Sequence, residues 1–409
     1  MSTISRRPLV SPSRRAVIGG AGAFFAWAFA PRPGHASGAR DPRFVVIVLR
    51  GALDGLTAVP AVGDPSYKSL RGDIAFGFDG ANKALPLDNF FGLHPAMANF
   101  ERLYRAKQAA IVHASATAYR DRSHFDGQDV LESGYATPGH TDSGWLNRLL
   151  ATLPKGSGVA SSSTTRGLAI GSNAPLVIRG SAPVLGWAPA TLKPADAELP
   201  ARLSDLYAHT DPLFARLLSE GIQTGKIASG LDVKARGGAG DPNGMEQMAT
   251  GAARLLAQPE GPRIAALAFE GWDTHAQELG RLARLLGGLD GAFAVFEKEM
   301  GPAWKDTVIL AVTEFGRTAH VNGTQGTDHG TGTVMFLAGG AVRGGRVIAD
   351  WPGLRSNQLR EGRDLAATID MRAIAKGVAV ELLDASPTNL GQVVFPGSQA
   401  VAPARGLIA

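Results

Sequence analysis

Short runs of β-branched residues alternate with helical patterns along most of the chain, and this alternation limits the folds that it can adopt. The run at 44–49 (FVVIVL) is continuously apolar, which is typical of a parallel strand buried on both faces. Similar runs lie at 263–269 and 307–313, separated by a long helical pattern at 276–299. Because parallel strands need crossover helices, we predict an α/β fold with a mostly parallel central sheet and helices on both faces.

The stretch from 155 to 245 departs from this alternation. It begins with a low-complexity loop at 154–165, ends in a glycine-rich part at 219–244, and has three short strand or loop segments between them. Long irregular segments of this kind are uncommon inside a compact domain. We therefore expect 40–409 to form one α/β domain, in which 155–245 is a loop-rich insertion or cap.

The first 36 residues have the layout of an export signal. Arg14 and Arg15 precede an uncharged, largely apolar run at 16–30, and small residues suited to cleavage follow as far as Ala36. The paired arginines predict export through the twin-arginine machinery, cleavage, and a periplasmic or secreted protein with no stable membrane span. The alternative is a retained N-terminal anchor, but the run is shorter than the roughly 20 residues of a membrane span.

The charge balance argues against a nucleic-acid partner. The chain has 41 Lys and Arg against 36 Asp and Glu, but five of the arginines and none of the acids lie in the leader, which leaves 36 of each. A general basic surface is therefore not expected. The lack of cysteine excludes disulfides, thiolate catalysis and zinc sites built from cysteine.

Polar clusters follow the predicted strands, at the sheet edge where open α/β folds bind their ligands. The clusters contain carboxylates and imidazoles, a donor set that suits Zn, Mn or Fe, whereas carboxylates alone suit Mg or Ca. Each residue alone could be a turn or capping residue, but capping does not explain imidazoles and carboxylates at successive strand ends. We therefore predict a site for one or two divalent ions, with Zn as the first choice. The predicted ligands are Asp54, Asp273, His275, Glu314, Asp328 and His329.

Ser123 is the candidate nucleophile. It opens the pattern Ser-x-x-Asp at 123–126, which is also a helix-capping pattern, and the plain alternative is a serine that only caps the helix. Next to a metal and a helix N-terminus, a serine could lose its proton and attack a phosphate or sulfate ester. Arg122 and Arg317 are candidates to hold the anionic oxygens of the substrate, although each could pair with a carboxylate instead. His124 is a further candidate ligand.

Five short segments occur in an order that is specific as a combination. They are RGALDGL at 50–56, RSHFDGQDVLESG at 122–134, GWDTH at 271–275, TEFGRT at 313–318 and NGTQGTDHG at 322–330. From about Phe44 to Leu383, the chain resembles the exported bacterial family catalogued as domain of unknown function 1501. That family is similar to a divergent branch of the alkaline phosphatase-like superfamily, which also holds sulfatases. The resemblance implies an alkaline phosphatase-like fold.

The resemblance also implies roles for individual residues. Asp54 resembles the first metal ligand of the superfamily, and Ser123 resembles its nucleophile. Asp273 and His275 are similar to its Asp/His ligand pair, although the usual pair is spaced more widely. His329 resembles its late histidine ligand.

One position departs from the superfamily pattern. Glu314 stands where the aspartate of an Asp-His dipeptide is expected, but Phe315 follows it. One of two metals would lose a ligand unless His113, His124 or Asp328 replaces it. A single-metal site, an altered metal and a lost activity all stay open on this evidence.

The leading expectation is an exported metal-dependent hydrolase of a small anionic ester, phosphate or sulfate, that uses a metal-activated serine or water. A non-catalytic envelope binding or assembly protein that retains the fold is the alternative. A glycosidase that uses a carboxylate pair is a weaker third option, because glycosidases do not need the histidines that accompany the acids here.

Overall fold

The computed structural model describes residues 40–153, 167–189, 198–211, 214–215, 218–219, 221, 237–259 and 261–409. The export signal predicted at 1–36 lies outside these residues, as do parts of the predicted insertion at 155–245. The chain divides into two units, 1–40 and 41–409, and the description that follows concerns the second. Within the described residues, no helix has the length and hydropathy that a transmembrane span requires.

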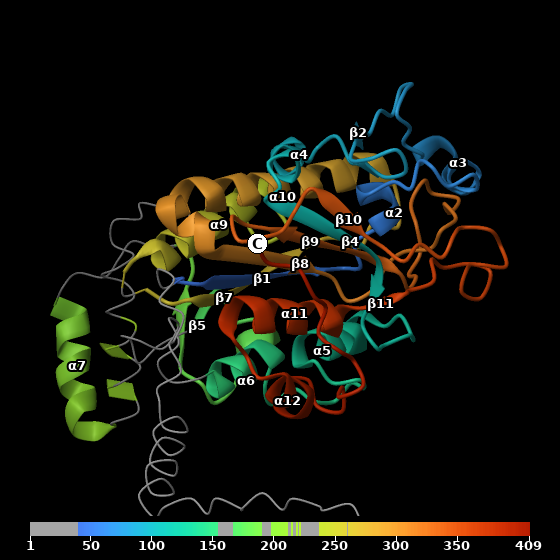
Figure 1. Ribbon diagram of the computed structural model, residues 1–409. Coiled ribbons are helices and arrows are strands. Elements are labelled where there is room, and N and C mark those ends of the chain that lie inside the picture. Colours follow the sequence, from blue (N-terminus) through green and yellow to red (C-terminus); the bar gives the residue numbers. More distant parts are fainter. Residues whose placement is uncertain are drawn as a thin grey trace, which may run out of the picture. The chain divides into compact units, whose positions relative to one another are not determined.

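A nine-stranded sheet forms the centre of this unit (Figure 1). The strands lie in the order β10-β4-β9-β8-β1-β7-β5-β6, and β11 pairs with β4. Their bounds are β1 (Arg43–Arg50), β4 (Ala109–Ala116), β5 (Gly167–Ile170), β6 (Val184–Trp187), β7 (Ile264–Glu270), β8 (Thr307–Val312), β9 (Thr333–Ala338), β10 (Arg346–Ile348) and β11 (Ile369–Asp370). A separate antiparallel pair consists of β2 (Leu85–Pro86) and β3 (Gly92–Leu93).

The sheet is mostly parallel, as the sequence predicts. Only β9 runs against its neighbours, β4 and β8, among the described pairings of this sheet. Because β9 lies between them and is antiparallel to both, β4 and β8 point the same way. The carboxyl ends of β4, β8, β1 and β7 therefore reach the same edge of the sheet, together with the start of β9.

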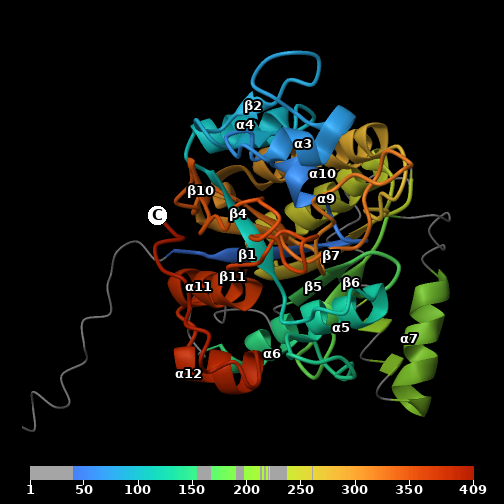
Figure 2. The same cartoon turned by 90° about the vertical axis from the view of Figure 1, so that its right-hand side faces the viewer.

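Helices cover both faces of the sheet (Figures 1 and 2). On one face lie α4 (Ala98–Arg105), α9 (Pro242–Ala257) and α10 (Glu278–Met300), and on the other lie α5 (His124–Ser133), α6 (Trp145–Thr152) and α11 (Met371–Leu383). Further α-helices among the described residues are α2 (Gly55–Ala58), α3 (Tyr67–Arg71), α7 (Glu198–Thr210) and α12 (Pro387–Asn389).

The central strand β1 shows why its sequence is continuously apolar. Val45, Ile47 and Leu49 are buried in the core that contains residues of α4, α9 and α10. Phe44 and Val48 point to the opposite face and are buried with residues of α6 and α11. Successive side chains of a strand point to opposite faces, so a strand between two helical layers needs apolar residues at every position.

One local expectation is wrong. Residues 176–178, which the sequence suggests as a short strand or extended loop, form a 3-10 helix, because Ile178 N and Arg179 N bond back to the carbonyls of Pro175 and Leu176. Helix α6 begins after Gly144. A Cβ on Gly144 would lie 2.1 Å from the Leu176 carbonyl oxygen, so this N-cap has no room for a capping side chain.

The segment predicted as an insertion contributes to the sheet. Strands β5 and β6 pair in parallel with each other, and β5 pairs with β7. They extend the central sheet beyond β7 at the side opposite to β4. The boundaries of the insertion and its role as a cap remain a prediction.

Candidate metal site

Loops from four parts of the chain meet at the edge where the parallel strands end. Helix α5 follows β4 through a loop at 117–123, and the segments 271–277 and 313–318 follow β7 and β8. The segment 322–331 precedes β9 and is joined to the other loops by backbone hydrogen bonds, among them Thr327 N to Thr274 O and Gly330 N to Gly316 O. These bonds fix the loops relative to one another and therefore fix the side chains that they carry.

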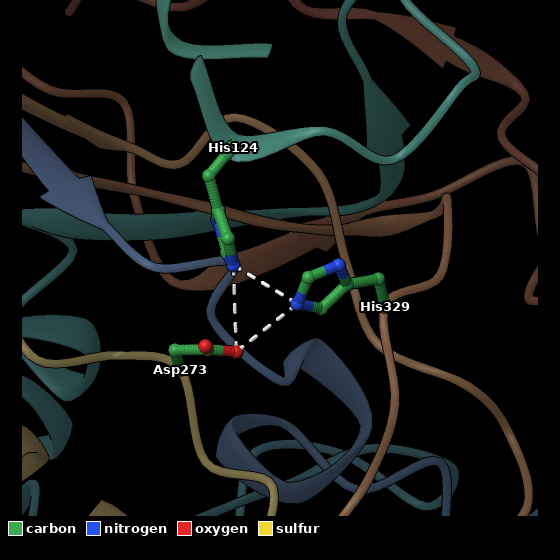
Figure 3. Close-up of side chains that lie close together, drawn as sticks. All are labelled: His124, Asp273 and His329. Atoms are coloured by element: carbon green, nitrogen blue, oxygen red, sulfur yellow. Dashed lines mark hydrogen bonds and ion pairs between the residues drawn. The ribbon is translucent and has the colours of Figure 1, made fainter. Parts of the chain in front are cut away.

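Three imidazole nitrogens converge on one carboxylate oxygen, Oδ1 of Asp273. The Nε2 atoms of His124, His275 and His329 lie 3.4, 2.9 and 3.2 Å from it. Nε2 of His329 is also 2.9 Å from Nε2 of His124 and 3.1 Å from Nε2 of His275. Figure 3 shows how His124, Asp273 and His329 point toward one another. We call the four residues His124, His275, His329 and Asp273 the His3Asp cluster.

Nδ1, the other nitrogen of each ring, lies within hydrogen-bonding distance of an oxygen atom. Nδ1 of His124 lies 2.9 Å from Oε1 of Glu314, and Nδ1 of His275 lies 3.3 Å from Oδ1 of Asp328. Nδ1 of His329 lies 3.0 Å from the backbone oxygen of Arg122. An oxygen at Nδ1 holds the ring proton there and leaves the Nε2 lone pair free toward the cluster, which is the usual arrangement around metal-binding histidines.

Donor atoms of His124, Asp273 and His329 all lie within 4.8 Å of one another, close enough to bind one ion, and His275 adds a fourth nitrogen beside Asp273 and His329. Zinc binds histidine nitrogen and carboxylate oxygen at about 2.0–2.2 Å, so a regular tetrahedron around it has edges of about 3.3–3.6 Å. The distances between donor atoms that involve Oδ1 of Asp273 or Nε2 of His329 run from 2.9 to 3.4 Å, so that all but one lie slightly below that range. Imidazole nitrogens this close need a proton or a cation between them. The donor set therefore fits a divalent ion such as Zn, Mn or Fe.

The charges around the cluster also favour a cation. Burial raises the pKa of Asp273, but the hydrogen bond and charge of Arg317 outweigh burial and leave this pKa below its ordinary value. The hydrogen bond that His124 donates to the Glu314 carboxylate raises the pKa of His124 against the effect of burial. Burial and the charge of His124 lower the pKa of His329. Asp273 is thus an anion at neutral pH, and at least one of the facing imidazoles is readily neutral.

The cluster is reachable from solvent. The side chains of its four residues keep between 24% and 44% of their exposure, with His124 the least and His275 the most exposed. Glu314, directly behind His124, is fully buried. Solvent therefore reaches one side of the cluster, while Glu314 behind it is shielded.

Glu314 and Asp328, both predicted ligands, lie behind the histidines. Oε1 of Glu314 accepts from Gly51 N at 2.9 Å and from Gln128 Nε2 at 3.1 Å, in addition to its contact with His124. Asp328 accepts from Asn322 Nδ2 at 3.2 Å. In this arrangement the two carboxylates orient His124 and His275.

Asp54 belongs to a different, fully buried group. Its carboxylate accepts from the backbone N–H groups of Leu56 and Thr57, which makes it the N-cap of α2. Its other oxygen lies 2.5 Å from Nη2 of Arg71 and near Glu278. The structure therefore brings Asp273, His275 and His329 together with His124, and places Asp54 in a separate network.

Ser123 occupies the position that the sequence predicts, at the N-cap of α5. Its side chain makes no capping hydrogen bond, and its backbone N–H donates to Tyr119 Oη at 3.3 Å. Arg122 forms ion pairs with Glu361 and Asp364. The serine is thus next to His124 in the chain, at a helix N-terminus, and its hydroxyl is not used for capping.

Arg317 lies behind the cluster. Nη1 of Arg317 is 2.6 Å from Oδ1 of Asp273, and its Nε donates to Thr327 Oγ1 at 3.2 Å. The Arg317 side chain is completely buried. Of the two arginines proposed to hold substrate oxygens, this one is occupied with orienting a carboxylate of the cluster.

Phe315 fills the position where the superfamily pattern has a histidine. Its ring is buried, stacks on His124 at a centroid distance of 5.1 Å and lies 5.4 Å from the ring of His329. His113 is far from this role, because it is buried between Phe91 and Val59, and burial lowers its pKa to about 4. His124, in contrast, directs Nε2 toward Asp273 and His329.

Strained backbone surrounds the site. Four non-glycine residues near it have positive φ: Ala52 (62°), Arg122 (62°), Gln277 (48°) and Gln325 (56°). Each such conformation costs on the order of 1–3 kcal/mol and persists only where the surrounding contacts impose it, most often at functional sites. The strain is therefore a further reason to regard these loops as a functional site.

The sequence indicates His124 only as a further candidate ligand, and it gives no indication of Arg71, Glu278 or Thr327. A signal for His124 was present, since it lies directly after the predicted nucleophile at a helix start. Arg71 and Glu278 carry no local signal, because a buried ion pair between a short helix and the start of a long one leaves no mark in either segment.

A family model described as "Protein of unknown function (DUF1501)" matches residues 87–378. No curated protein matches the chain. Among solved structures, Ps i-CgsB in complex with k-i-k-neocarrahexaose has a TM-score of 0.44 at 12% identity, over 88% of this chain and 77% of that chain. The lipoteichoic acid synthase LtaP from Listeria monocytogenes has a TM-score of 0.41 at 11% identity, over 90% and 78%. Alkaline phosphatase from the Antarctic bacterium TAB5 has a TM-score of 0.31 at 12% identity, over 74% and 91%.

Proposed function

We propose that this chain, which belongs to the family described as protein of unknown function (DUF1501), is an exported metal-dependent hydrolase of small phosphate or sulfate esters. The leader at 1–36 would take it through the twin-arginine machinery to the periplasm or the outside of the cell. The His3Asp cluster would hold a divalent ion, with Zn as the first choice and Mn, Fe, Ca or Mg as alternatives.

One observation carries the proposal. Three histidines keep Nδ1 on an oxygen acceptor and direct Nε2 at the same carboxylate oxygen of Asp273. A structural histidine needs only one satisfied hydrogen bond, and three such rings around one carboxylate gain nothing without a cation. The partial exposure of the cluster leaves a side open for a substrate, as catalytic metal sites require.

The bound ion and the residues around the cluster would have different roles in ester hydrolysis. A bound divalent ion would lower the pKa of a nearby hydroxyl or water and neutralise charge on the transferring group. Ser123, at the N-terminus of α5, is placed to act as nucleophile, and the free N–H groups of that helix end favour an anion. Arg122 would hold an anionic oxygen of the substrate if it can leave its partners Glu361 and Asp364.

Metal content and turnover test the proposal together. We expect the purified mature protein to contain a transition metal by elemental mass spectrometry and to hydrolyse at least one aryl phosphate or sulfate in a metal-dependent way. His275→Ala with His329→Ala should lose both properties. His320→Ala, which removes an exposed imidazole from the neighbouring loop, is the matched control and should keep both. A native protein that takes up no ion, even after incubation with Zn, Mn, Fe, Ca and Mg, would refute the metal site.

A non-catalytic binding or assembly protein is the second candidate. The observation that favours it is Phe315, whose buried ring covers the side of His124 and His329 where a further ligand would otherwise lie. Binding of inorganic phosphate or sulfate to the metal-loaded protein, without turnover of any ester in the screen, would support this alternative.

A further inference from the structure

Two carboxylates and one arginine form a buried group beside the His3Asp cluster. Asp54, Arg71 and Glu278 are each no more than 1% exposed. Nη2 of Arg71 lies 2.5 Å from Oδ2 of Asp54 and 3.3 Å from Oε1 of Glu278, and it also donates to Thr57 Oγ1. The hydroxyl of Thr57 donates to Oε1 of Glu278 at 2.7 Å. Nη2 of Arg71 thus contacts three oxygen atoms, one from each of these side chains.

A chain of hydrogen bonds joins this group to the cluster. Oε2 of Glu278 accepts from Thr327 Oγ1 at 2.6 Å. Arg317 donates through Nε to the same Thr327 hydroxyl at 3.2 Å and through Nη1 to Oδ1 of Asp273 at 2.6 Å. The orientation of Asp273 therefore depends, through Arg317 and Thr327, on where Glu278 is held.

We infer that Arg71 is a built-in cation that occupies the place of a second metal ion, so that the chain binds one ion, at the His3Asp cluster. This inference rests on the proposed function for the first ion. Asp54 is then a partner of Arg71 rather than a ligand, and Arg71 is a positioning residue that holds Glu278 and, through it, the arginine behind Asp273.

The occupied space and the charge both exclude an ion next to Arg71. An ion between Asp54 and Glu278 would need the oxygens that Nη2 of Arg71 already contacts. It would also bring two cations into a group with no solvent exposure, where like charges repel strongly. The second oxygen of Asp54 is already used by the backbone N–H groups of α2. The sequence-based expectation of Asp54 as a ligand does not fit these contacts.

The contacts of Arg71 also show that it is a fixed part of the fold. Nη1 of Arg71 donates to the backbone oxygens of Thr318 and Ala319, which follow the arginine behind Asp273. Arg71 ends α3, so this short helix brings the cation to the site. Because both terminal nitrogens of its guanidinium are bonded in this way, Arg71 does not move aside to admit an ion.

Asp54→Asn distinguishes a ligand from an arginine partner. We expect the native protein to contain one equivalent of zinc after loading and dialysis, and Asp54→Asn to contain one equivalent with a dissociation constant within about threefold of the native value. Two equivalents in the native protein, or the loss of an equivalent in Asp54→Asn, would overturn the inference. No zinc in the native protein would instead refute the proposed metal site and leave the arginine network as a purely structural feature.

Arg71→Ala tests the role of the cation directly. We expect a lower Tm, at least tenfold weaker zinc binding at the cluster, and partial recovery of both by guanidinium at millimolar concentration. Arg43→Ala, which removes a buried arginine that bonds to Leu256 and Asp41 at the far end of β1, is the matched control. It should lower Tm without changing zinc affinity and without recovery by guanidinium. Unchanged zinc affinity in Arg71→Ala would contradict the positioning role, and if that variant does not fold, Arg71→Lys tests the same affinity.

Discussion

Oε1 of Glu314 lies 2.9 Å from Nδ1 of His124, on the side of the ring that faces away from the His3Asp cluster. Burial raises the pKa of Glu314, but hydrogen bonds from His124, Gln128 and the backbone outweigh it and keep the carboxylate ionised. An ionised carboxylate at Nδ1 fixes the ring and makes Nε2 a better donor to a metal. Glu314, which the sequence predicts as a metal ligand, is thus placed to orient another ligand, His124.

Glu314→Gln should weaken metal binding without abolishing it. A glutamine keeps the shape and one acceptor but removes the charge that makes His124 more basic, so we expect an affinity loss of about tenfold to 100-fold. Competition with a chelating dye measures this loss. Asp328→Asn is the comparison, and its effect should be smaller because Asp328 is more exposed and lies 3.3 Å from its histidine. An equal or larger loss in Asp328→Asn would contradict the assigned roles.

Metal affinity should increase with pH near neutrality. A proton on Nε2 of His124 competes with the metal, and the hydrogen bond that His124 donates to Glu314 raises the pKa of His124 above its ordinary value of 6.5. Affinity should therefore be low below that raised pKa and should reach a plateau above it. In Glu314→Gln the midpoint should move to lower pH, because the largest cause of the shift is removed. An affinity that does not change between about pH 5.5 and 8 would argue against His124 as a ligand.

The convergence of the site could be predicted from the sequence because it follows from strand direction. Continuous apolar runs mark β1, β7 and β8, and the polar residues after each run must then lie at one edge of a parallel sheet. The antiparallel β9 does not disturb this, because its residues at the same edge are those that precede it. His329 therefore joins Asp273 although it comes before a strand rather than after one.

The division into ligands and orienting residues could not be predicted, because it depends on which way loop side chains point. Glu314 and His124 are separated by 190 residues, and their contact arises from the packing of α5 against the end of β8. The role of Arg71 could not be predicted for a related reason, because α3 is five residues long and lies outside the α/β alternation. Sequence patterns indicate where polar residues gather, while their partners are set by the packing of the loops.

Ser123→Ala should separate a serine nucleophile from a metal-bound water. The Ser123 side chain makes no capping hydrogen bond in α5, so the substitution should leave Tm nearly unchanged, unlike a true N-cap replacement that costs about 1 kcal/mol. Metal content should also stay the same, because the hydroxyl is not one of the four cluster donors. If Ser123 is the nucleophile, turnover should fall by several orders of magnitude. Full activity in Ser123→Ala would assign the attack to water.

Gly51→Ala should disturb the metal site, because the added Cβ would clash with the backbone at Asp273. Gly51 has a φ of +123°, and a Cβ there would lie 2.5 Å from the backbone nitrogen of Asp273. The clash would push apart the ends of β1 and β7, so we expect a loss of more than about 2 kcal/mol in the free energy of unfolding and weaker metal binding. Gly301→Ala is the control, because Gly301 has a φ of +51° but nothing within 4 Å of the added Cβ. It should cost about 1 kcal/mol and leave metal affinity unchanged, and equal costs for both variants would contradict the clash.

Stability of the metal-free protein should fall as pH rises from about 5 to 8. Burial and the charge of Asp54 raise the pKa of Glu278 from 4.5 to about 8. Between these two values the folded state binds more protons than the unfolded state, so the free energy of unfolding decreases with pH, by an amount on the order of a few kcal/mol. The lowered pKa of Asp54 acts in the opposite direction but only at acid pH, below its ordinary 3.8.

Glu278→Gln isolates this contribution. Its free energy of unfolding in urea should be nearly flat from about pH 5 to 8, apart from the smaller effect of His124, whose raised pKa gives stability that is also lost as pH rises through it. The control is Glu270→Gln, at an exposed carboxylate on the same edge of the sheet, which should keep the slope of the native protein. If Glu278→Gln and the native protein show the same slope, the proton is not held at Glu278, and the carboxylate is ionised beside Arg71 throughout this range.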